Sequence, residues 1–347
     1  MTLEFGLDTF GDVTWDANRQ LLSQREVLAN VVAEAVLADE AGVDVIGLGE
    51  HHRDDFAISS PEVLLAAIGA RTRRIRLGTA VTVLGSDDPV RLFQRFSTLD
   101  AISGGRAEVT LGRGSFTESF PLFGHDLADY ATLFEEKLDL FSQLIRAPEV
   151  TWAGRTRAPL SRQRVFPPLG PEGLRCWIGV GGSPESVLRA VRFRLPMILA
   201  IIGGAPRRFL PFAELYRDTA RRAGLAPMPL GVHSPGHIAE TDEQARDEAF
   251  PAYKVLHDRL GRERGWPSLG RDDFLREIEQ GSMYVGSPET VARKIADTAR
   301  ALGLARFQLK YSQGPLGHEA MMRSIELYGQ RVIPLVRDHL AQAAPAA

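Results

Sequence analysis

The chain of 347 residues alternates short apolar runs with longer segments in which apolar residues recur every three or four positions. Short runs rich in Val, Ile and Leu are typical of strands buried on both faces of a parallel sheet, whereas the longer spacing is typical of amphipathic helices. The strands predicted from the apolar runs are Leu3–Asp8, Val43–Gly49, Ile75–Leu84, Ala107–Leu111, Cys176–Val180, Pro196–Ile202, Pro229–His237 and Ala305–Tyr311.

A helical pattern follows each predicted strand. The clearest start is Ser183-Pro184, because a serine caps a helix and a proline suits its first position. The clearest stops are Gly42 and the pair Gly104-Gly105, since glycine readily ends a helix. The predicted helices are Arg25–Ala41, Pro61 to about Thr72, Pro89–Ser103, Tyr130–Arg146, Ser183–Phe193, Pro206–Ala223, Asp242–Arg264, Asp272–Ile278, Pro288–Leu302 and His318–Leu340.

Repeated strand–helix units predict an α/β fold, a (β/α)8 TIM barrel with insertions, formed by residues 1–347 as a single domain. An open doubly wound sheet is the alternative, but no G-x-G-x-x-G motif follows the first strand, where Gly6 and Gly11 are isolated. Two insertions are expected, at about 148–173 and about 231–281, and the second is the candidate lid. The Ala-rich tail after Leu340 is expected to fray.

Composition and charge exclude several classes of protein. Hydrophobic residues make up 44% and charged residues 24%, so a disordered chain or a disulfide scaffold is excluded. A net charge of −3 gives no reason to expect a nucleic-acid or membrane partner. The single cysteine, Cys176, begins a predicted strand and is expected in the core of a reduced, cytoplasmic protein. No signal-peptide pattern and no spanning apolar run is present, so we expect a soluble protein.

In a barrel of this kind, function resides at the carboxyl ends of the strands. One such end is followed by Gly181-Gly182-Ser183, where two glycines allow close backbone approach and a helix N-terminus follows. The hydroxyls of Ser183 and Ser186 can add donors, and Arg113 ends the preceding strand. The alternative is an ordinary helix cap, but together with Arg113 and the barrel the segment favours phosphate binding.

A second strand end carries Glu50-His51-His52. Adjacent residues of a strand point to opposite faces, so the two histidines are unlikely ligands of one metal ion, and no metal is expected. We expect His51 to be a neutral histidine that moves a proton or holds substrate, and His52 to be a loop residue held by Asp54 or Asp55. Of the other histidines, His233 can line the pocket, whereas His237, His257, His318 and His339 are expected at the surface or at helix caps.

The chain resembles the bacterial luciferase-like monooxygenase family, a set of flavin-dependent (β/α)8 proteins. The resemblance covers nearly the whole chain and is weakest over 148–173 and 231–281. The motifs that carry it are Arg76–Leu84, Pro89–Arg91, Leu99–Arg106 and Leu111–Gly114, with further matches at Glu50–His52, Gly181–Ser183 and Val285–Glu289.

The resemblance implies roles for individual positions. His51 matches the active-site histidine beside the flavin and the substrate, and Arg113 matches the arginine that binds the flavin phosphate. Ala80–Val81 matches a non-proline cis peptide that packs against the flavin ring. The remaining cofactor-binding positions it implies are Ser115, Gly181, Gly182, Ser183 and Ser186.

The resemblance also implies a reaction. Reduced FMN, as co-substrate, would react with O2 to oxygenate a small organic molecule, and the site would have to exclude water. A separate flavin reductase is expected because no dinucleotide-binding motif is present, and a homodimer is implied. Gly112 stands where the luciferases have a reactive cysteine and Gly182 where they have a carboxylate, so light emission and an aldehyde substrate are not implied.

Three other functions remain open at the level of the sequence. The first is hydride transfer with a deazaflavin coenzyme on the same fold. The second is flavin binding without turnover. The third is hydrolysis by a metal-dependent barrel.

Overall fold

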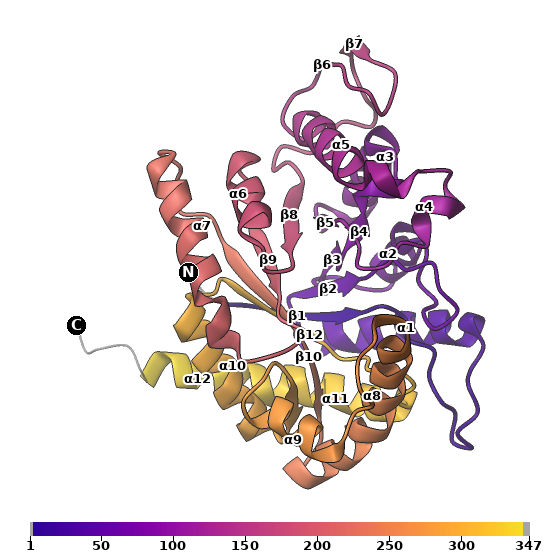
Figure 1. The fold of residues 1–347 in the computed structure, drawn as a ribbon, viewed down its shortest axis with the longest axis vertical. Helices are drawn as coiled ribbons and strands as arrows, with labels where there is room; N and C mark the ends of the chain where they lie inside the picture. The colour runs from indigo at the N-terminus through magenta and orange to yellow at the C-terminus, as the bar shows by residue number, and fades with distance from the viewer. Residues whose placement is uncertain (1–2, 343–347) are drawn as a thin grey trace.

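The computed structural model describes residues 3–342, and within them the strands form a nearly closed parallel barrel (Figure 1). Their order is β3–β2–β1–β12–β10–β9–β8–β5–β4, and the Leu77 N–H donates to the Arg106 carbonyl at 2.9 Å to join the two ends. The predicted TIM-barrel fold is therefore confirmed. The strands are β1 (Glu4–Thr9), β2 (Val45–Leu48), β3 (Arg76–Thr79), β4 (Thr82–Val83), β5 (Glu108–Gly112), β8 (Arg175–Val180), β9 (Met197–Ala200), β10 (Leu230–Ile238) and β12 (Arg306–Lys310).

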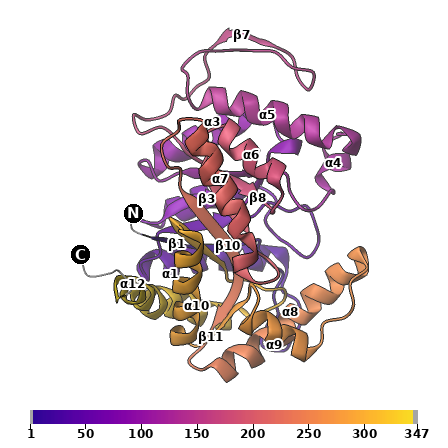
Figure 2. The same ribbon diagram turned by 60° about the vertical axis from the view of Figure 1, so that its left-hand side comes forward.

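Helices surround the barrel, as Figures 1 and 2 show from two sides. The predicted cap Ser183 accepts an N–H group of the helix it precedes, and two further caps were not predicted: Ser23 and Glu26 form a capping box, and Asp88 accepts N–H groups of the helix that follows it. The helices are α1 (Gln24–Glu40), α2 (Pro61–Gly69), α3 (Pro89–Ser103), α4 (Ser119–Leu122), α5 (Tyr130–Leu144), α6 (Pro184–Arg192), α7 (Leu210–Arg222), α8 (Asp242–Arg264), α9 (Arg271–Glu279), α10 (Pro288–Leu302), α11 (His318–Leu327) and α12 (Ile333–Gln342).

Two predicted elements differ in the structure. The strand expected over Ile75–Leu84 is divided into β3 and β4 by a cis peptide bond between Ala80 and Val81, the bond that the resemblance implies. The closing helix expected over His318–Leu340 contains a π-helical turn at Tyr328–Val332. A Cβ on Gly329 would lie 2.4 Å from the Ala41 carbonyl oxygen, so this turn packs tightly on the end of α1.

The two expected insertions contain regular structure. Within 148–173, β6 (Val150–Trp152) and β7 (Leu160–Gln163) form an antiparallel hairpin. The stretch 231–281 begins inside β10 and continues through α8 and α9, which pack with β11 (Tyr284–Gly286), a strand that the sequence reading missed. The hairpin and the α8–α9 pair lie at opposite ends of the molecule in both views (Figures 1 and 2).

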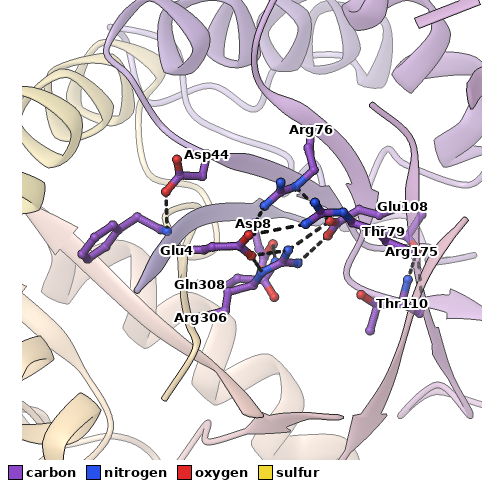
Figure 3. Close-up of polar contacts among 11 residues, drawn as sticks. Glu4, Asp8, Asp44, Arg76, Thr79, Glu108, Thr110, Arg175, Arg306 and Gln308 are labelled. Carbon is purple, nitrogen blue, oxygen red and sulfur yellow. Dashed lines mark hydrogen bonds and ion pairs between the residues drawn. The ribbon is translucent and has the colours of Figure 1, made fainter. Parts of the chain in front are cut away.

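The amino end of the barrel is closed by a group of charged residues around the buried pair Arg306 and Glu108 (Figure 3). The fully buried guanidinium of Arg306 bonds Glu108 and lies 2.7 Å from Glu4 Oε2, and Arg76 and Arg175 also pair with Glu4. Arg306 stacks on the Trp177 ring at 4.4 Å. This end is filled by side chains, which leaves the carboxyl end of the barrel as the place for a ligand.

The described part of the chain contains no helix with both the length and the apolar character required to cross a membrane. The tail after Leu340, for which fraying is expected, lies largely outside the described residues.

Candidate active site

A cavity of about 380 Å³ opens at the carboxyl end of the barrel. The tips of the barrel strands line it, and α8 supplies one wall. Seven of the nine site residues predicted from the sequence lie on this single cavity: His51, Ala80, Val81, Arg113, Ser115, Gly181 and Ser186. Gly182 and Ser183 are not lining residues and lie next to it in the turn before α6.

The start of α6 has the local structure expected of a helix cap. The Ser183 hydroxyl oxygen accepts the Ser186 N–H at 3.3 Å and lies 2.9 Å from the Ser186 hydroxyl. Gly182 has a φ of +92°, a backbone conformation that residues other than glycine rarely adopt. Ser183 therefore caps α6 and lies against the hydroxyl of Ser186, which lines the cavity, while its contact with a phosphate stays a prediction.

Arg113 directly follows β5, whose neighbouring strand β8 leads into α6. Its guanidinium lies 5.4 Å from the centre of the Tyr130 ring, and residues 3–342 provide it with no ion pair or hydrogen bond. The Tyr130 hydroxyl donates to the Gly114 carbonyl at 3.1 Å and so holds the loop that follows Arg113. An arginine with free donors beside a helix N-terminus is well suited to bind a phosphate.

Glycines make room for the Ala80–Val81 peptide on the cavity wall. A Cβ on Gly112 would lie 2.3 Å from Val81 Cγ2, and a Cβ on Gly179 would lie 3.1 Å from Val81 Cγ1. The absence of side chains at these two positions allows Val81 to sit between β5 and β8. Ala80, Val81, Gly112 and Gly179 all line the cavity here.

His51 is enclosed by three phenylalanine rings. The ring centres of Phe10, Phe56 and Phe116 lie 4.6, 4.5 and 5.2 Å from the imidazole. Burial lowers the pKa of His51 to about 3, and the nearby positive charge of Lys310 acts in the same direction. The side chain is therefore neutral near pH 7, as expected, and its Nε2 is buried without a partner within residues 3–342.

His52 is a loop residue, as expected, but the prediction that Asp54 or Asp55 holds it is wrong. Its Nε2 lies 2.9 Å from Glu50 Oε1, and the other oxygen of Glu50 accepts the Val83 N–H at 2.8 Å. Residues 50 and 52 share one side of the extended chain, which brings them together. The carboxylates of Asp54 and Asp55 instead pair with arginines.

Two of the histidines expected at the surface or at helix caps lie elsewhere. His237 is fully buried in β10, where its Nε2 lies 2.8 Å from Glu248 of α8. His257 lines the cavity from α8. His318 does lie at a helix start, and its Nδ1 is 2.8 Å from Glu34.

Cys176 is buried in β8, as expected for a core residue. Burial raises the pKa of its thiol to about 12, so the thiolate is not formed near neutral pH. The His, Cys, Asp and Glu side chains within residues 3–342 form no group of three or more that could hold a metal ion.

His233 lines the cavity, as expected, but sequence reasoning missed the two ion pairs at the base of the cavity. His233 Nδ1 lies 2.6 Å from Asp8 Oδ2, and Lys310 Nζ lies 3.0 Å from Asp12 Oδ2. Asp8, His233 and Lys310 all line the cavity. Asp8 and His233 each lie near the end of a predicted strand, but no sequence signal indicates that these two residues form a pair.

Sequence reasoning also missed the side chains of the α8 wall, although the stretch 231–281 is the candidate lid. The amphipathic pattern of α8 indicates a buried face but not what that face covers. The wall consists of Tyr253, Leu256, His257, Leu260, Arg264 and Trp266.

An ion-pair group centred on Arg53 joins this wall to the loop that carries His51. Arg53 Nη2 lies 2.6 Å from Glu263 of α8, Nη1 lies 2.6 Å from Glu118, and Nε lies 3.0 Å from Asp55. Burial alone would lower the pKa of Arg53, but hydrogen bonds to these carboxylates more than offset it and raise the pKa. Arg259 of α8 adds a pair with Asp55 at 3.1 Å.

The comparison with known families agrees with this geometry. The model of luciferase-like monooxygenases matches residues 9–306. The chain belongs to the luciferase-like monooxygenase family. Among curated relatives, the 4-hydroxyprotoasukamycin monooxygenase of Streptomyces nodosus subsp. asukaensis is 27% identical over 311 residues, which cover 85% of this chain and 83% of that protein.

Solved structures of low sequence identity share the fold. A monooxygenase from Streptomyces bottropensis has a TM-score of 0.84 at 23% identity, covering 96% of this chain and 99% of that chain. The oxygenating constituent of 3,6-diketocamphane monooxygenase from Pseudomonas putida, in complex with FMN, has a TM-score of 0.78 at 20% identity with the same coverage. The coenzyme F420-dependent tetrahydromethanopterin reductase of Methanopyrus kandleri has a TM-score of 0.72 at 19% identity, again with 96% and 99% coverage.

Proposed function

We propose that this protein is an FMN-dependent monooxygenase, which uses reduced FMN and O2 to oxygenate a small organic substrate. The observation that supports it most is that the phosphate-binding candidates Arg113, Ser115 and Ser186 line the same cavity as His51 and the Ala80–Val81 peptide. A flavin phosphate and a flavin ring would need these two groups at opposite parts of one cavity.

The residues present fit FMN. Arg113 offers a forked cation with no protein partner among residues 3–342, and the α6 N-terminus and Ser186 offer further donors. Gly112 and Gly179 make room for Val81, whose peptide with Ala80 lines the same cavity and can lie against a planar ring. When bound, the flavin supplies the electron transfer to oxygen that the side chains of this chain cannot perform.

The protein's own part is to orient the ligands and to exclude water. The aromatic rings around His51 and the apolar side chains of α8 surround the space beside the Ala80–Val81 peptide. His51 presents a neutral imidazole there, which can hold a hydrogen bond but carries no charge near pH 7. If a flavin binds here, these side chains would keep water away from it during its reaction with oxygen.

Hydride transfer with a deazaflavin is the second candidate, because the fold is shared with an F420-dependent reductase. Flavin preference can be measured directly, since Trp266 lines the cavity and its fluorescence reports a bound ring. We expect FMN to quench tryptophan fluorescence at lower concentration than F420. Tighter binding of F420 would overturn the proposed cofactor.

Oxygen chemistry needs a separate test. Photoreduced FMN is mixed with the protein without air, oxygen is admitted, and the return of the visible absorbance of oxidised flavin is followed beside hydrogen peroxide release. We expect the protein to slow this return relative to free FMN. Return at the rate of free FMN, despite saturating binding, would favour flavin binding without turnover.

The flavin reductase, the homodimer and a cytoplasmic location remain proposals. We expect the purified protein with FMN to leave NADH unoxidised until a flavin reductase is added, because no nicotinamide-binding motif is present in the sequence. Oxidation of NADH by the protein alone would contradict the need for a separate reductase. Light scattering of the purified chain tests the dimer.

A further inference from the structure

A second histidine faces the cavity from its base, and unlike His51 it is held by a carboxylate. His233 Nδ1 lies 2.6 Å from Oδ2 of Asp8, a residue of β1 that is fully buried. The other oxygen of that carboxylate, Oδ1, accepts the side-chain amide of Gln308 at 2.8 Å. Both oxygens of Asp8 are therefore engaged, one by an amide and one by the imidazole.

Burial opposes the ionised form of Asp8, whereas the hydrogen bonds with His233 and Gln308 favour it. An ionised carboxylate accepts hydrogen bonds only, so in that form of Asp8 the His233 nitrogen beside it is the donor, Nδ1–H. In the neutral ring, Nε2 is then the acceptor. Nε2 has no partner within residues 3–342, and the side chain keeps 10% exposure on the cavity it lines.

His51 lacks such an orienting group. Its three closest ring neighbours are phenylalanines, and its Nε2 is buried without a partner in the described structure. Phe10 contacts both imidazoles, edge-on to His51 at 4.6 Å and stacked on His233 at 6.0 Å. The two histidines thus belong to one site but differ in their environments, one apolar and one paired with a carboxylate.

We infer that His233 is the proton-transferring residue of this site and that Asp8 is its positioning residue. His233 Nε2 accepts a proton from the bound substrate or cofactor, and the imidazolium so formed is balanced by the Asp8 carboxylate. The Nε2–H later gives the proton back to the bound substrate or cofactor. This step restores neutral His233 beside the Asp8 carboxylate, and neither residue is oxidised or reduced. The inference rests on the proposed function and assigns the proton transfer within it.

The charges around His233 do not oppose this role. Lys310, on the neighbouring strand β12, is paired with Asp12 at 3.0 Å and lies 4.5 Å from the Phe10 ring. Burial raises the pKa of Asp8, whereas its hydrogen bond and charge interaction with His233 act against that rise. The other titratable groups that face the same cavity are Glu50, His51, Arg113, Tyr130, Tyr253, His257 and Arg264.

The tautomer can be measured without any flavin or substrate. Histidine ring nitrogens of the ¹⁵N-labelled protein are observed by NMR, and His233→Gln assigns the signals of His233. We expect the Nδ1–H form in the native protein. In Asp8→Asn, the amide can donate to Nδ1, so the ring should shift toward the Nε2–H form. An Nε2–H tautomer in the native protein, or no change in Asp8→Asn, would overturn the inference.

A second measurement uses reduced FMN and oxygen as the probe. In His233→Gln we expect FMN affinity to stay close to that of the native protein. The native protein changes the rate of flavin reoxidation relative to free FMN, and in the variant we expect the size of this difference to be about 10²- to 10⁴-fold smaller and independent of pH. His318→Gln is the matched control, because it removes a histidine–carboxylate pair that lies outside the cavity. An unchanged rate and pH profile in His233→Gln would overturn the inference.

These two experiments separate the inference from the proposed function. If FMN fails to bind while the NMR tautomer is as expected, the cofactor assignment is wrong but the His233–Asp8 pair stands as a proton-transferring group for another ligand. If FMN binds and the tautomer is reversed, the proposed function stands and the inference fails.

Discussion

At the scale of single residues, the surface offered to a flavin ring depends on the fit between Gly112 and Val81. A Cβ on Gly112 would lie 2.3 Å from Val81 Cγ2, a distance at which atoms must move. Gly112 lies in β5 and Val81 in the short link between β3 and β4, and neither has a long side chain whose rotation could relieve the contact. Luciferases carry a cysteine at the position of Gly112. In this chain Val81 occupies the space that such a side chain would need.

Replacement of Gly112 tests this fit. We expect Gly112→Ala to lower the free energy of unfolding by about 1–3 kcal/mol, the usual cost of overpacking. Val81→Ala in the same chain should recover most of that loss, and urea denaturation of the four proteins measures the coupling. Gly181→Ala is the control, since a Cβ there meets nothing within 4 Å. If the two substitutions changed the free energy of unfolding additively, the contact between residue 112 and Val81 would not be the cause of the loss.

Individual site residues were predictable where the signal is local. Arg113 and Ser183 follow strands and precede a loop or a helix, so their position at the carboxyl end follows from the fold. His52 was given the wrong partner because the extended chain places it beside Glu50 rather than beside Asp54 or Asp55. The pairing of Asp8 with His233 joins residues 225 positions apart, and nothing in the sequence links them.

At the scale of elements, charged residues join α8 to the loop that carries His51, in addition to the apolar face that α8 buries. Its residues Glu263 and Arg259 pair with the loop that carries His51, through Arg53 and Asp55. The side chain of Arg53 is only 8% exposed, whereas Glu118 and Glu263 are 37% and 41% exposed, so water screens part of these interactions. The pair with Asp55, which is 13% exposed, is the best shielded of the three.

Loss of Arg53 is therefore expected to loosen α8. In Arg53→Gln we expect the opening free energy of α8, measured by amide hydrogen exchange, to fall by about 1–3 kcal/mol, with smaller changes in the barrel strands. Arg262→Gln is the control, because Arg262 is an exposed residue of the same helix with no ion pair in the described structure. Equal exchange in the two variants would show that Arg53 does not fasten the helix.

A second contact holds α8 to the barrel, the pair of His237 in β10 with Glu248 in α8, and it should affect how stability depends on pH. A hydrogen bond from buried His237 lowers the pKa of Glu248 from 4.5 to about 2. Because the folded-state pKa is the lower one, this stabilisation is present above the unfolded value and is lost as the pH falls from about 4.5 to about 2. We expect Glu248→Gln to reduce the loss of stability between about pH 6 and about pH 3 in urea titrations. An unaltered loss would contradict the role of this pair.

The elements themselves were largely predictable, because caps and apolar runs are local. Helices such as Pro89–Ser103 begin and end as predicted, at Asp88 and Gly104. The strand β11 has three residues and gives no periodic signal. The break of Ile75–Leu84 into β3 and β4 follows from a backbone geometry that an apolar run does not encode.

At the scale of the whole molecule, the two ends of the barrel have different tasks. The amino end is filled by Arg306, which is fully buried between Glu4 and Glu108 (Figure 3), whereas the carboxyl end holds the cavity. In barrels of this type, stability resides at the first end and function at the second. This separation predicts that substitutions at the amino end change the free energy of unfolding without changing FMN affinity, and that loss of a ligand-binding side chain at the carboxyl end, such as Arg113, does the reverse.

Glu108→Gln tests the amino end. The change leaves the buried Arg306 with an incomplete set of acceptors, so we expect the free energy of unfolding to fall by about 3–5 kcal/mol, as measured by chemical denaturation. The FMN affinity of the folded protein should be unchanged. A variant that kept full stability but bound FMN more weakly would contradict the separation.

The most direct test of the central claim compares FMN with riboflavin, which lacks the phosphate, in the native protein and in Arg113→Ala. The dissociation constants are measured by quenching of tryptophan fluorescence. If Arg113 binds the flavin phosphate, the substitution weakens FMN binding by roughly 10- to 150-fold, and riboflavin binding does not change. Equal weakening of both ligands, or no weakening of FMN binding, would contradict the account.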